Sequence, residues 1–244
     1  MALANDLTRI APRPARRRTV NWPLAVGGTI VGLVLVMALA APLLAPYSPY
    51  DQSLVSRLLP PAWVEGGNPA HLLGTDHLGR DYLSRLIYGA RVSLSIGLVT
   101  ILISGSIGVT LGVLAGYFGG RVDTLVTYLV TVRLAMPAVI VALAIVALVG
   151  NSFQTIMTVL GLLLWDQFAI VSRSVTRQIV SQDYIMAARS MGMPTAKIIV
   201  SDLLPNLMPM VVVVATVEMA SAIMVESSLS FLGLGVQPPT LPGG

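Results

Sequence analysis

The sequence predicts an all-α fold, a polytopic helical membrane protein, and composition is the first reason. Hydrophobic residues make up 55% of the 244 residues, charged residues only 11%, and the mean hydropathy is +0.81. Ordinary soluble domains carry about 25% charged residues. The second reason is that uncharged apolar blocks of about 20 residues recur along the chain, and each is long enough to cross a bilayer as a helix.

Five apolar blocks are predicted to be membrane spans. A cleaved secretory signal is the alternative for the first block, but the uncharged stretch 19–50 exceeds the roughly 7 to 15 apolar residues of a signal core. Residues 134–165 are too few for two complete spans and the turn at 150–152, so Arg133 and Asp166 are expected inside helices. The predicted spans are 22–46, 92–117, 124–149, 155–176 and 205–234.

The basic residues give the chain an orientation and a domain plan. With a cytoplasmic N-terminus, the cytoplasmic segments carry ten Lys and Arg residues and the extracytoplasmic segments carry four. This excess inside follows the positive-inside rule. The plan is a basic cytoplasmic tail at 1–21, a first span at 22–46, an extracytoplasmic segment at 47–91, and a membrane core at 92–244 that contains a cytoplasmic loop, 177–204.

Composition also argues against several kinds of function. No cysteine is present, so disulfides and thiolate metal sites are excluded. The net charge of +4 does not indicate nucleic-acid binding, because the arginines are not gathered into one stripe with aromatic residues. His71 and His77 have no third ligand nearby and do not make a metal site. Since no phosphate-binding loop or catalytic constellation is present either, the chain is not expected to be an enzyme.

A short polar segment between apolar blocks, 183–205, has the pattern of a helix that docks in a groove. Asp183 is a candidate N-cap, but Met186 stands where a capping box has Glu or Gln. Gly192 is expected to end the helix in the left-handed conformation. From this pattern alone, an ordinary interfacial helix between spans is the alternative. The expected docking face consists of Tyr184, Ala187, Ala188 and Met191.

Small residues recur at every fourth position in the span 92–117. This pattern lets two helix backbones approach closely. The face is expected to pack within the subunit or against a partner rather than to contact a substrate. Its members are Ser104, Gly108, Gly112 and Gly116.

Four ionisable residues fall inside the predicted spans, where a charge is costly and therefore marks a functional candidate. Arg133 and Asp166 are expected either to pair or to reach toward the cytoplasmic surface. Glu218 and Glu226 are separated by about 80° around an ideal helix, so they share a broad interior face. For these two glutamates, lining of a pore and structural hydrogen bonding both stay open.

The segment LGTDHLGRDYLSRLIYGARVSL, residues 73–94, resembles the segment before the second span in permeases of dipeptide, oligopeptide and nickel ABC importers. The loop 183–205 is similar to the coupling loop of these permeases, and GYFGGRVD at 116–123 and SLSFLGLGVQPPT at 228–240 also match. Upstream pieces, PPAW, EGG and AHLLGTD, resemble the second permease of dipeptide-type systems. Matching residues in the first segment include Gly74, Thr75, Asp76, Gly79, Arg80, Asp81, Ser84 and Arg85.

The resemblance implies a type I ABC importer permease fold in the bacterial inner membrane. It implies a heterodimer with a homologous permease, two ATP-binding subunits and an extracytoplasmic solute-binding protein. ATP and magnesium then belong to the ATP-binding subunits, and no cofactor is bound by this chain. The helix 183–191, with Gly192, is implied to couple to the ATPases. An importer of nickel or another small solute and a non-conducting truncated remnant are the alternatives.

Two positions depart from the family pattern. Met186 occupies the place of the coupling motif's glutamate, which removes a charge that can cap the helix or pair with an ATPase arginine. The similarity also stops after Thr240, where the relatives continue into a loop and a sixth span. Five spans are therefore expected in this chain, with the family's sixth missing.

Overall fold

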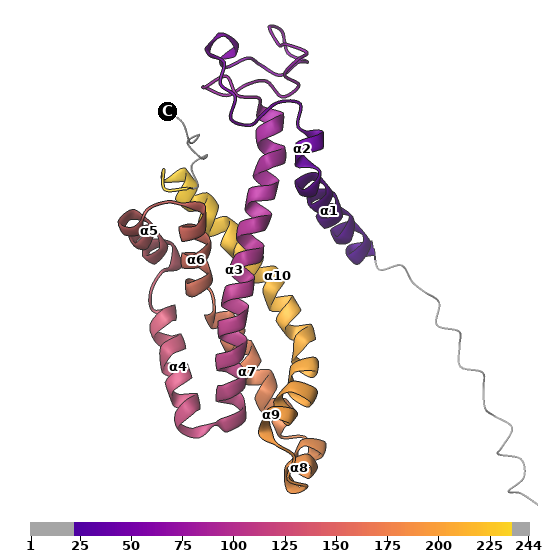
Figure 1. The fold of residues 1–244 in the computed structure, drawn as a ribbon, viewed down its shortest axis with the longest axis vertical. Coiled ribbons are helices and arrows are strands. Elements are labelled where there is room, and N and C mark those ends of the chain that lie inside the picture. Colours follow the sequence, from indigo (N-terminus) through magenta and orange to yellow (C-terminus); the bar gives the residue numbers. More distant parts are fainter. Residues whose placement is uncertain (1–21, 236–244) are drawn as a thin grey trace, which may run out of the picture.

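The computed structural model describes residues 22–235, in which every regular element is a helix and no β-strand is present (Figure 1). The predicted all-α fold is confirmed. The basic tail at 1–21 and the predicted boundary after Thr240 lie outside the described residues. The helices are α1 (Trp22–Leu39), α2 (Ala41–Leu44), η1 (Leu54–Ser56), α3 (Tyr82–Phe118), α4 (Gly120–Leu134), α5 (Ala138–Val149), α6 (Phe153–Leu163), α7 (Asp166–Val180), α8 (Asp183–Ser190), α9 (Thr195–Lys197), the π-helical η2 (Ile198–Leu203) and α10 (Leu204–Phe231).

The longest unbroken helix, α3, runs through the middle of the bundle (Figure 1). Its 37 residues rise about 55 Å, which exceeds the roughly 30 Å hydrocarbon core of a bilayer. The predicted span 92–117 lies inside it, and the ten residues before that span extend the helix at one end. The loops that precede α3 gather at this end, and α8 lies at the opposite end of the bundle (Figure 1).

The predicted span 124–149 is wrong as a single helix. The chain is bent by 80° between α4 and α5. Pro137 explains the break, because its ring has no N–H to donate and disfavours a helical conformation at the residue before it. Pro137 instead stands at the N-cap of α5 with an extended ψ of 119°. Hydropathy alone does not detect this break.

The predicted span 155–176 lies within one stretch long enough to cross a membrane, Phe153–Val180, which has only a local irregularity. Helix α6 ends at Leu163 and α7 begins at Asp166. The predicted turn before α6 is confirmed, since Gly150 has φ +109° and the Ser152 hydroxyl accepts a hydrogen bond from the Thr155 N–H at 3.1 Å. The expected helical positions of Arg133 and Asp166 are confirmed as well, at the end of α4 and the start of α7.

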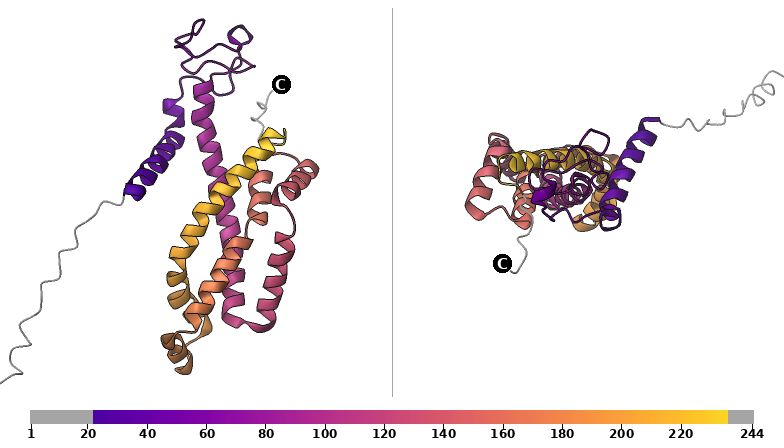
Figure 2. Two further views of the ribbon diagram at one scale, coloured as in Figure 1. Left: turned by 180° about the vertical axis from the view of Figure 1, so that it is seen from behind. Right: turned by 90° about the horizontal axis from the view of Figure 1, so that it is seen from above.

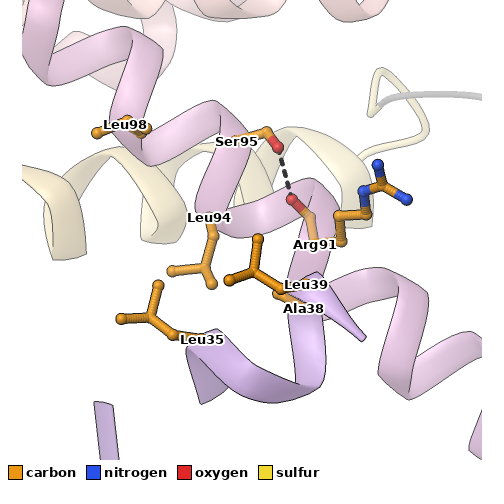
Figure 3. A pocket seen from close by; sticks show the side chains of 7 residues that line it. All are labelled: Leu35, Ala38, Leu39, Arg91, Leu94, Ser95 and Leu98. Atoms are coloured by element: carbon orange, nitrogen blue, oxygen red, sulfur yellow. Dashed lines mark hydrogen bonds between the residues drawn. The ribbon is translucent and has the colours of Figure 1, made fainter. Parts of the chain in front are cut away.

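Helix α1 leaves the bundle and approaches α3 only near the end that carries the loops (Figure 2). A groove of about 340 Å³ lies between the two helices (Figure 3). The predicted first span, 22–46, is interrupted, because α1 ends at Leu39 and the short α2 follows. The groove is lined by Leu35, Ala38, Leu39, Arg91, Leu94, Ser95 and Leu98.

Within residues 22–235, three helical stretches are long and apolar enough to cross a membrane: Tyr82–Phe118, Phe153–Val180 and Thr195–Phe231. The bent pair of α4 and α5 makes a fourth if it is taken as one span. The apolar helix Ala25–Leu39 within α1 is shorter. The polytopic prediction is confirmed, and the assignment of α1 as a fifth span stays a prediction.

The most extensive helix–helix contact within residues 22–235 joins α3 to α7, and glycines make it possible. A Cβ atom on Gly108 would lie 2.3 Å from the Trp165 carbonyl oxygen, and one on Gly116 would lie 2.7 Å from the Thr176 Cβ. These separations are too short for any side chain larger than hydrogen. The predicted small-residue face therefore packs within the subunit, with Ser104 buried on the same helix.

Apolar side chains fill the bundle on either side of this contact. One cluster joins α3, α5, α6 and α10 at the end near the loops, and α4 packs against α3 and α7 through another. Asp123 at the start of α4 forms ion pairs with Arg173 and Arg177 of α7. The first cluster consists of Ile96, Ala142, Val146, Ile156, Val159, Leu160, Leu163 and Leu229.

Replacing Gly112 by alanine is expected to destabilise the subunit. The new Cβ would lie 2.6 Å from the Ala169 carbonyl oxygen and 2.7 Å from the Ser172 Cβ. Because one of these neighbours is backbone, α3 and α7 must separate, at a cost of about 1–3 kcal/mol. The measurement is the midpoint of thermal unfolding of the detergent-solubilised protein, followed by tryptophan fluorescence.

Gly89→Ala on the same helix is the matched control. Gly89 is exposed, and no heavy atom lies within 4 Å of its Cβ position. This change is expected to be neutral or to stabilise by roughly 0.5–1 kcal/mol through helix propensity. Equal unfolding midpoints for the two variants would contradict the glycine-dependent contact.

Candidate functional site

The segment predicted to dock against a partner forms a separate helix, α8, at the tip of the bundle (Figure 1). It follows α7 after a two-residue turn and leads through α9 and η2 into α10. One short helix thus interrupts the path between two long helices.

The start of α8 differs from the prediction by one residue. The Gln182 carbonyl accepts hydrogen bonds from the N–H groups of Ile185 and Met186, at 3.1 and 3.2 Å. Gln182 is therefore the N-cap, and Asp183 is the first helical residue. Met186 is the fourth helical residue and Ile185 the third. A carboxylate at position 186 cannot complete a capping box, which requires the third position.

The end of α8 is as predicted. Gly192 has φ +77°. Its N–H donates to the Arg189 carbonyl at 2.9 Å, and the Met193 N–H donates to the Ala188 carbonyl at 3.1 Å. This pair of bonds is a Schellman motif. No heavy atom lies within 4 Å of a Cβ built on Gly192, so glycine is required for its conformation rather than for space.

The two faces of α8 have different environments. Tyr184, Ala187 and Met191 are exposed, together with Met186, which is 50% exposed. Ala188 is buried, so the prediction that it shares one docking face with the other three is wrong.

The buried face of α8 attaches the helix to its own subunit. Ile185, which the sequence analysis missed, is fully buried beside Ala188. The sequence could have indicated Ile185, because it is an apolar residue three positions before Ala188 and this spacing places the two residues on one helix face. The cluster around them consists of Ile179, Ile185, Ala188, Ile198 and Leu203.

At the other end of the bundle, Asp76 organises the motif that precedes α3. Its carboxylate accepts hydrogen bonds from the backbone N–H groups of Leu78 and Arg80, at 2.8 and 2.9 Å, and from the Arg80 Nε at 2.8 Å. Arg85 pairs with the same carboxylate. Burial acts to raise the pKa of Asp76, but these donors outweigh it and lower the pKa to about 2.

Asp81 connects the same loop to α3. As the N-cap of α3, it accepts hydrogen bonds from the Ser84 N–H at 2.8 Å and the Ser84 hydroxyl at 2.7 Å. Its second oxygen lies 3.0 Å from the His71 Nδ1. The Ser84 hydroxyl also accepts the Tyr47 N–H at 3.2 Å. The segment that leaves α2 is thereby held at the start of α3.

The remaining motif residues allow two segments of the loop to pass close to each other. The Thr75 hydroxyl accepts the Leu59 N–H at 2.9 Å. Gly74 and Gly79 have φ of +76° and +73°, and Cβ atoms on them would lie 2.3 Å from the Leu59 oxygen and 1.8 Å from the Ser53 oxygen. The predicted motif is therefore a scaffold that fixes residues 47–81 on α3. Within residues 22–235, no group of His, Asp or Glu side chains is arranged to hold a metal ion.

The predicted intramembrane charges meet where two helices break. The Arg133 Nη2 lies 3.7 Å from the Asp166 Oδ1, and both side chains are largely buried, so the predicted pair is confirmed. Arg133 also donates to the backbone carbonyls of Leu163 and Met136.

Glu218 and Glu226 are buried among the helices of the subunit itself. No described side chain forms a hydrogen bond with either carboxylate, so structural hydrogen bonding stays a prediction as well. Pore lining by these two residues stays a prediction.

A family model described as the binding-protein-dependent transport system inner membrane component matches residues 108–241, more than half of the chain. The chain belongs to this family. A second model, the N-terminal transmembrane domain of oligopeptide transport permease C, matches residues 15–61. The predicted family is therefore confirmed, and the chain is a multi-pass inner-membrane protein of the transport permease type.

Named relatives in this family match nearly the whole chain. The di/tripeptide transport system permease protein DppC of Pseudomonas aeruginosa (strain UCBPP-PA14) is 42% identical over 243 residues, which cover 98% of this chain and 80% of the relative. DppC of Escherichia coli (strain K12) is 40% identical over 90% of this chain and 73% of its own length. DppC of Bacillus subtilis (strain 168) is 39% identical, with coverages of 92% and 69%.

The low pKa of Asp76 predicts how the loop of this permease responds to acid. The pKa falls from 3.8 to about 2 on folding, so the ionised carboxylate stabilises the loop fully above about pH 4. That contribution is lost as the pH falls from about 4 to 2. Pepsin cleavage within residues 47–81, normalised to a denatured substrate, is expected to rise over this interval.

Asp76→Asn is the comparison for the acid response. The amide keeps the size of the side chain but carries no charge to lose. This variant is therefore expected to be cleaved readily at pH 5, and its cleavage is expected to change little as the pH falls to 2. If the wild-type protein resisted pepsin equally at pH 5 and pH 2, the role assigned to the carboxylate would be contradicted.

Proposed function

We propose that this chain is a transmembrane permease subunit of an ATP-driven importer of dipeptides or oligopeptides. The similarity to peptide permeases over at least 90% of the chain in three relatives supports the substrate class. The observation that carries the mechanism is α8, a helix fixed to the subunit by a buried face, with an uncovered apolar face at the tip of the bundle.

The proposed complex contains a homologous permease, two ATP-binding subunits and an extracytoplasmic solute-binding protein. The two permeases form the translocation pathway together. ATP and magnesium are assigned to the ATP-binding subunits. The N-terminus and α8 are assigned to the cytoplasm, because the positive-inside rule then places ten Lys and Arg residues inside and four outside.

The two faces of α8 explain how it couples. Exposed Tyr184 and Met191 fit a groove on an ATP-binding subunit, as the apolar residues of a docked helix do. Ile185 and Ala188 hold the opposite face against α7 and η2. Closure of the ATP-binding subunits therefore moves α8 and the attached ends of α7 and α10 together.

Reconstitution of the whole complex tests the function. Proteoliposomes that contain this chain, the partner permease, the ATP-binding subunits and the binding protein are expected to accumulate a labelled dipeptide only with ATP. Labelled nickel serves as the competing substrate. Nickel uptake without peptide uptake would reassign the substrate, and uptake of neither would overturn the importer.

Gly192→Val is expected to uncouple the complex. A β-branched residue at φ +77° is strained, by about 1–2 kcal/mol relative to glycine, so the Schellman motif and the orientation of α8 are lost. The measurement is the stimulation of ATPase activity by the peptide-loaded binding protein, together with uptake.

Gly192→Asn is the matched variant, because asparagine adopts the left-handed conformation more readily than other non-glycine residues. It is expected to retain most of the stimulation. If Gly192→Val retained it as well, the coupling role of α8 would be refuted.

A further inference from the structure

An arginine and a tyrosine join α8 to the end of α3. The Arg189 guanidinium carbon lies 4.3 Å from the centroid of the Tyr117 ring. Arg189 stands in the last turn of α8, and Tyr117 is the penultimate residue of α3. A cation held over an aromatic face at this distance is attracted by the negative charge of the ring face.

The Tyr117 ring contacts apolar neighbours at the end of α3. It packs against the buried cluster around Ile185, and its edge-to-face contact with Phe118 has ring centroids 5.2 Å apart at 78°. Because the ring is held on α3, the direction of its face determines where the Arg189 guanidinium lies. Residues 72 positions apart in the sequence thereby join α3 to α8.

Helix α3 differs from the other long elements of residues 22–235 in having no interruption. The path through α4 and α5 bends by 80°, and the path through α6 and α7 is divided at 164–165. The path into α10 passes through the π-helical η2 and includes Pro209. A displacement at one end of α3 therefore reaches the other end without crossing a break.

The far end of α3 is attached to the loops by part-buried hydrogen bonds. Asp81 caps the helix and contacts His71, and Ser84 holds the Tyr47 N–H. In the orientation proposed above, these loops face the solute-binding protein. One straight helix then links the surface that receives the substrate to the helix that docks on the ATPases.

We propose that Arg189 and Tyr117 are positioning residues for coupling: their contact transmits displacement of α3 to α8. This inference rests on the proposed function. Helix α8 is also connected along the chain to α7 and α9. The helical paths that lead to α8 through these two connections contain a break or a π-helical segment, and the contact with α3 supplements them. The chemistry required is a cation over an aromatic face, so the phenol hydroxyl of Tyr117 is not needed.

Four substitutions in the complete complex separate this role from general packing. Tyr117→Leu and Arg189→Gln remove the aromatic face or the cation. Tyr117→Phe and Arg189→Lys retain them. The readout is the ratio of ATPase activity with and without peptide-loaded binding protein, at equal amounts of assembled complex measured by size-exclusion chromatography.

The first pair is expected to lower the stimulation ratio about two- to fivefold, the factor that corresponds to an exposed cation–π contact. The second pair is expected to stay within twofold of the wild type. The double variant Tyr117→Leu with Arg189→Gln should lose no more than either single variant, because both remove the same contact.

Four results would overturn the proposal, and three of them refute the contact directly. They are an unchanged ratio in Arg189→Gln, an equal loss in Tyr117→Phe and Tyr117→Leu, and additive losses in the double variant. An equal loss in Arg189→Lys and Arg189→Gln would instead assign Arg189 to a guanidinium-specific bond with an ATPase carboxylate, and would overturn the proposal as well.

A spectroscopic measurement tests the contact independently of transport. The chain has no native cysteine, so Leu102→Cys on α3 and Met191→Cys after α8, both exposed, provide two specific spin-label sites. The distance distribution in the full chain, in lipid, is expected to broaden in Arg189→Gln and Tyr117→Leu but not in Tyr117→Phe.

The two experiments distinguish the possible failures. A complex that shows no peptide-stimulated ATPase activity, with the expected change in label distances, refutes the importer and leaves the contact intact. Normal stimulation in every variant, with unchanged distances, refutes the contact and leaves the importer intact.

Discussion

The close approach of α3 and α7 is the constraint on which the rest of the subunit depends. Gly108, Gly112 and Gly116 remove every side-chain atom from one face of α3, so the α7 backbone lies where a Cβ would otherwise stand. Lipid chains are as apolar as leucine, so burial of apolar surface does not hold membrane helices together. Van der Waals contact between backbones does, and it requires a face without side chains. Helix α8 follows α7 in the chain, so the contact between α3 and α7 also determines where α8 begins.

Sequence patterns predicted the elements whose signals are local. The recurrence of Gly108, Gly112 and Gly116 gave the tight interface, and Gly192 gave the end of α8, because both depend on the absence of a Cβ. The broken helix at Pro137 was missed, although its residue was visible, because an average over apolar residues is insensitive to one proline. The start of α8 was misplaced by one residue: Gln182 occupies the N-cap position without a side-chain capping bond, so the preference of Asp183 for that position did not decide the boundary.

The geometry of the motif before α3 lay beyond sequence reasoning for another reason. Its resemblance to peptide permeases was recognisable, but its contacts are with residues far away in the chain, such as Ser53 and Leu59. No periodicity indicates that a carbonyl from residue 53 will lie against Gly79. The same holds for Arg189 and Tyr117, whose contact spans two helices and the turns between them. Local patterns identify elements, and the packing of those elements determines which side chains meet.

The side chain of Arg133 has a consequence for how the subunit deforms. It binds the Leu163 and Met136 carbonyls and Asp166, so the interruptions of two neighbouring helical paths are fixed beside one another. A backbone carbonyl released by a helix break is otherwise unsatisfied in hydrocarbon. With these carbonyls occupied, the break exists in the folded membrane protein without a large energetic penalty. Because one side chain holds both interruptions together, a change in the angle of one break requires a change at the other, and the two helical paths bend as a coupled pair.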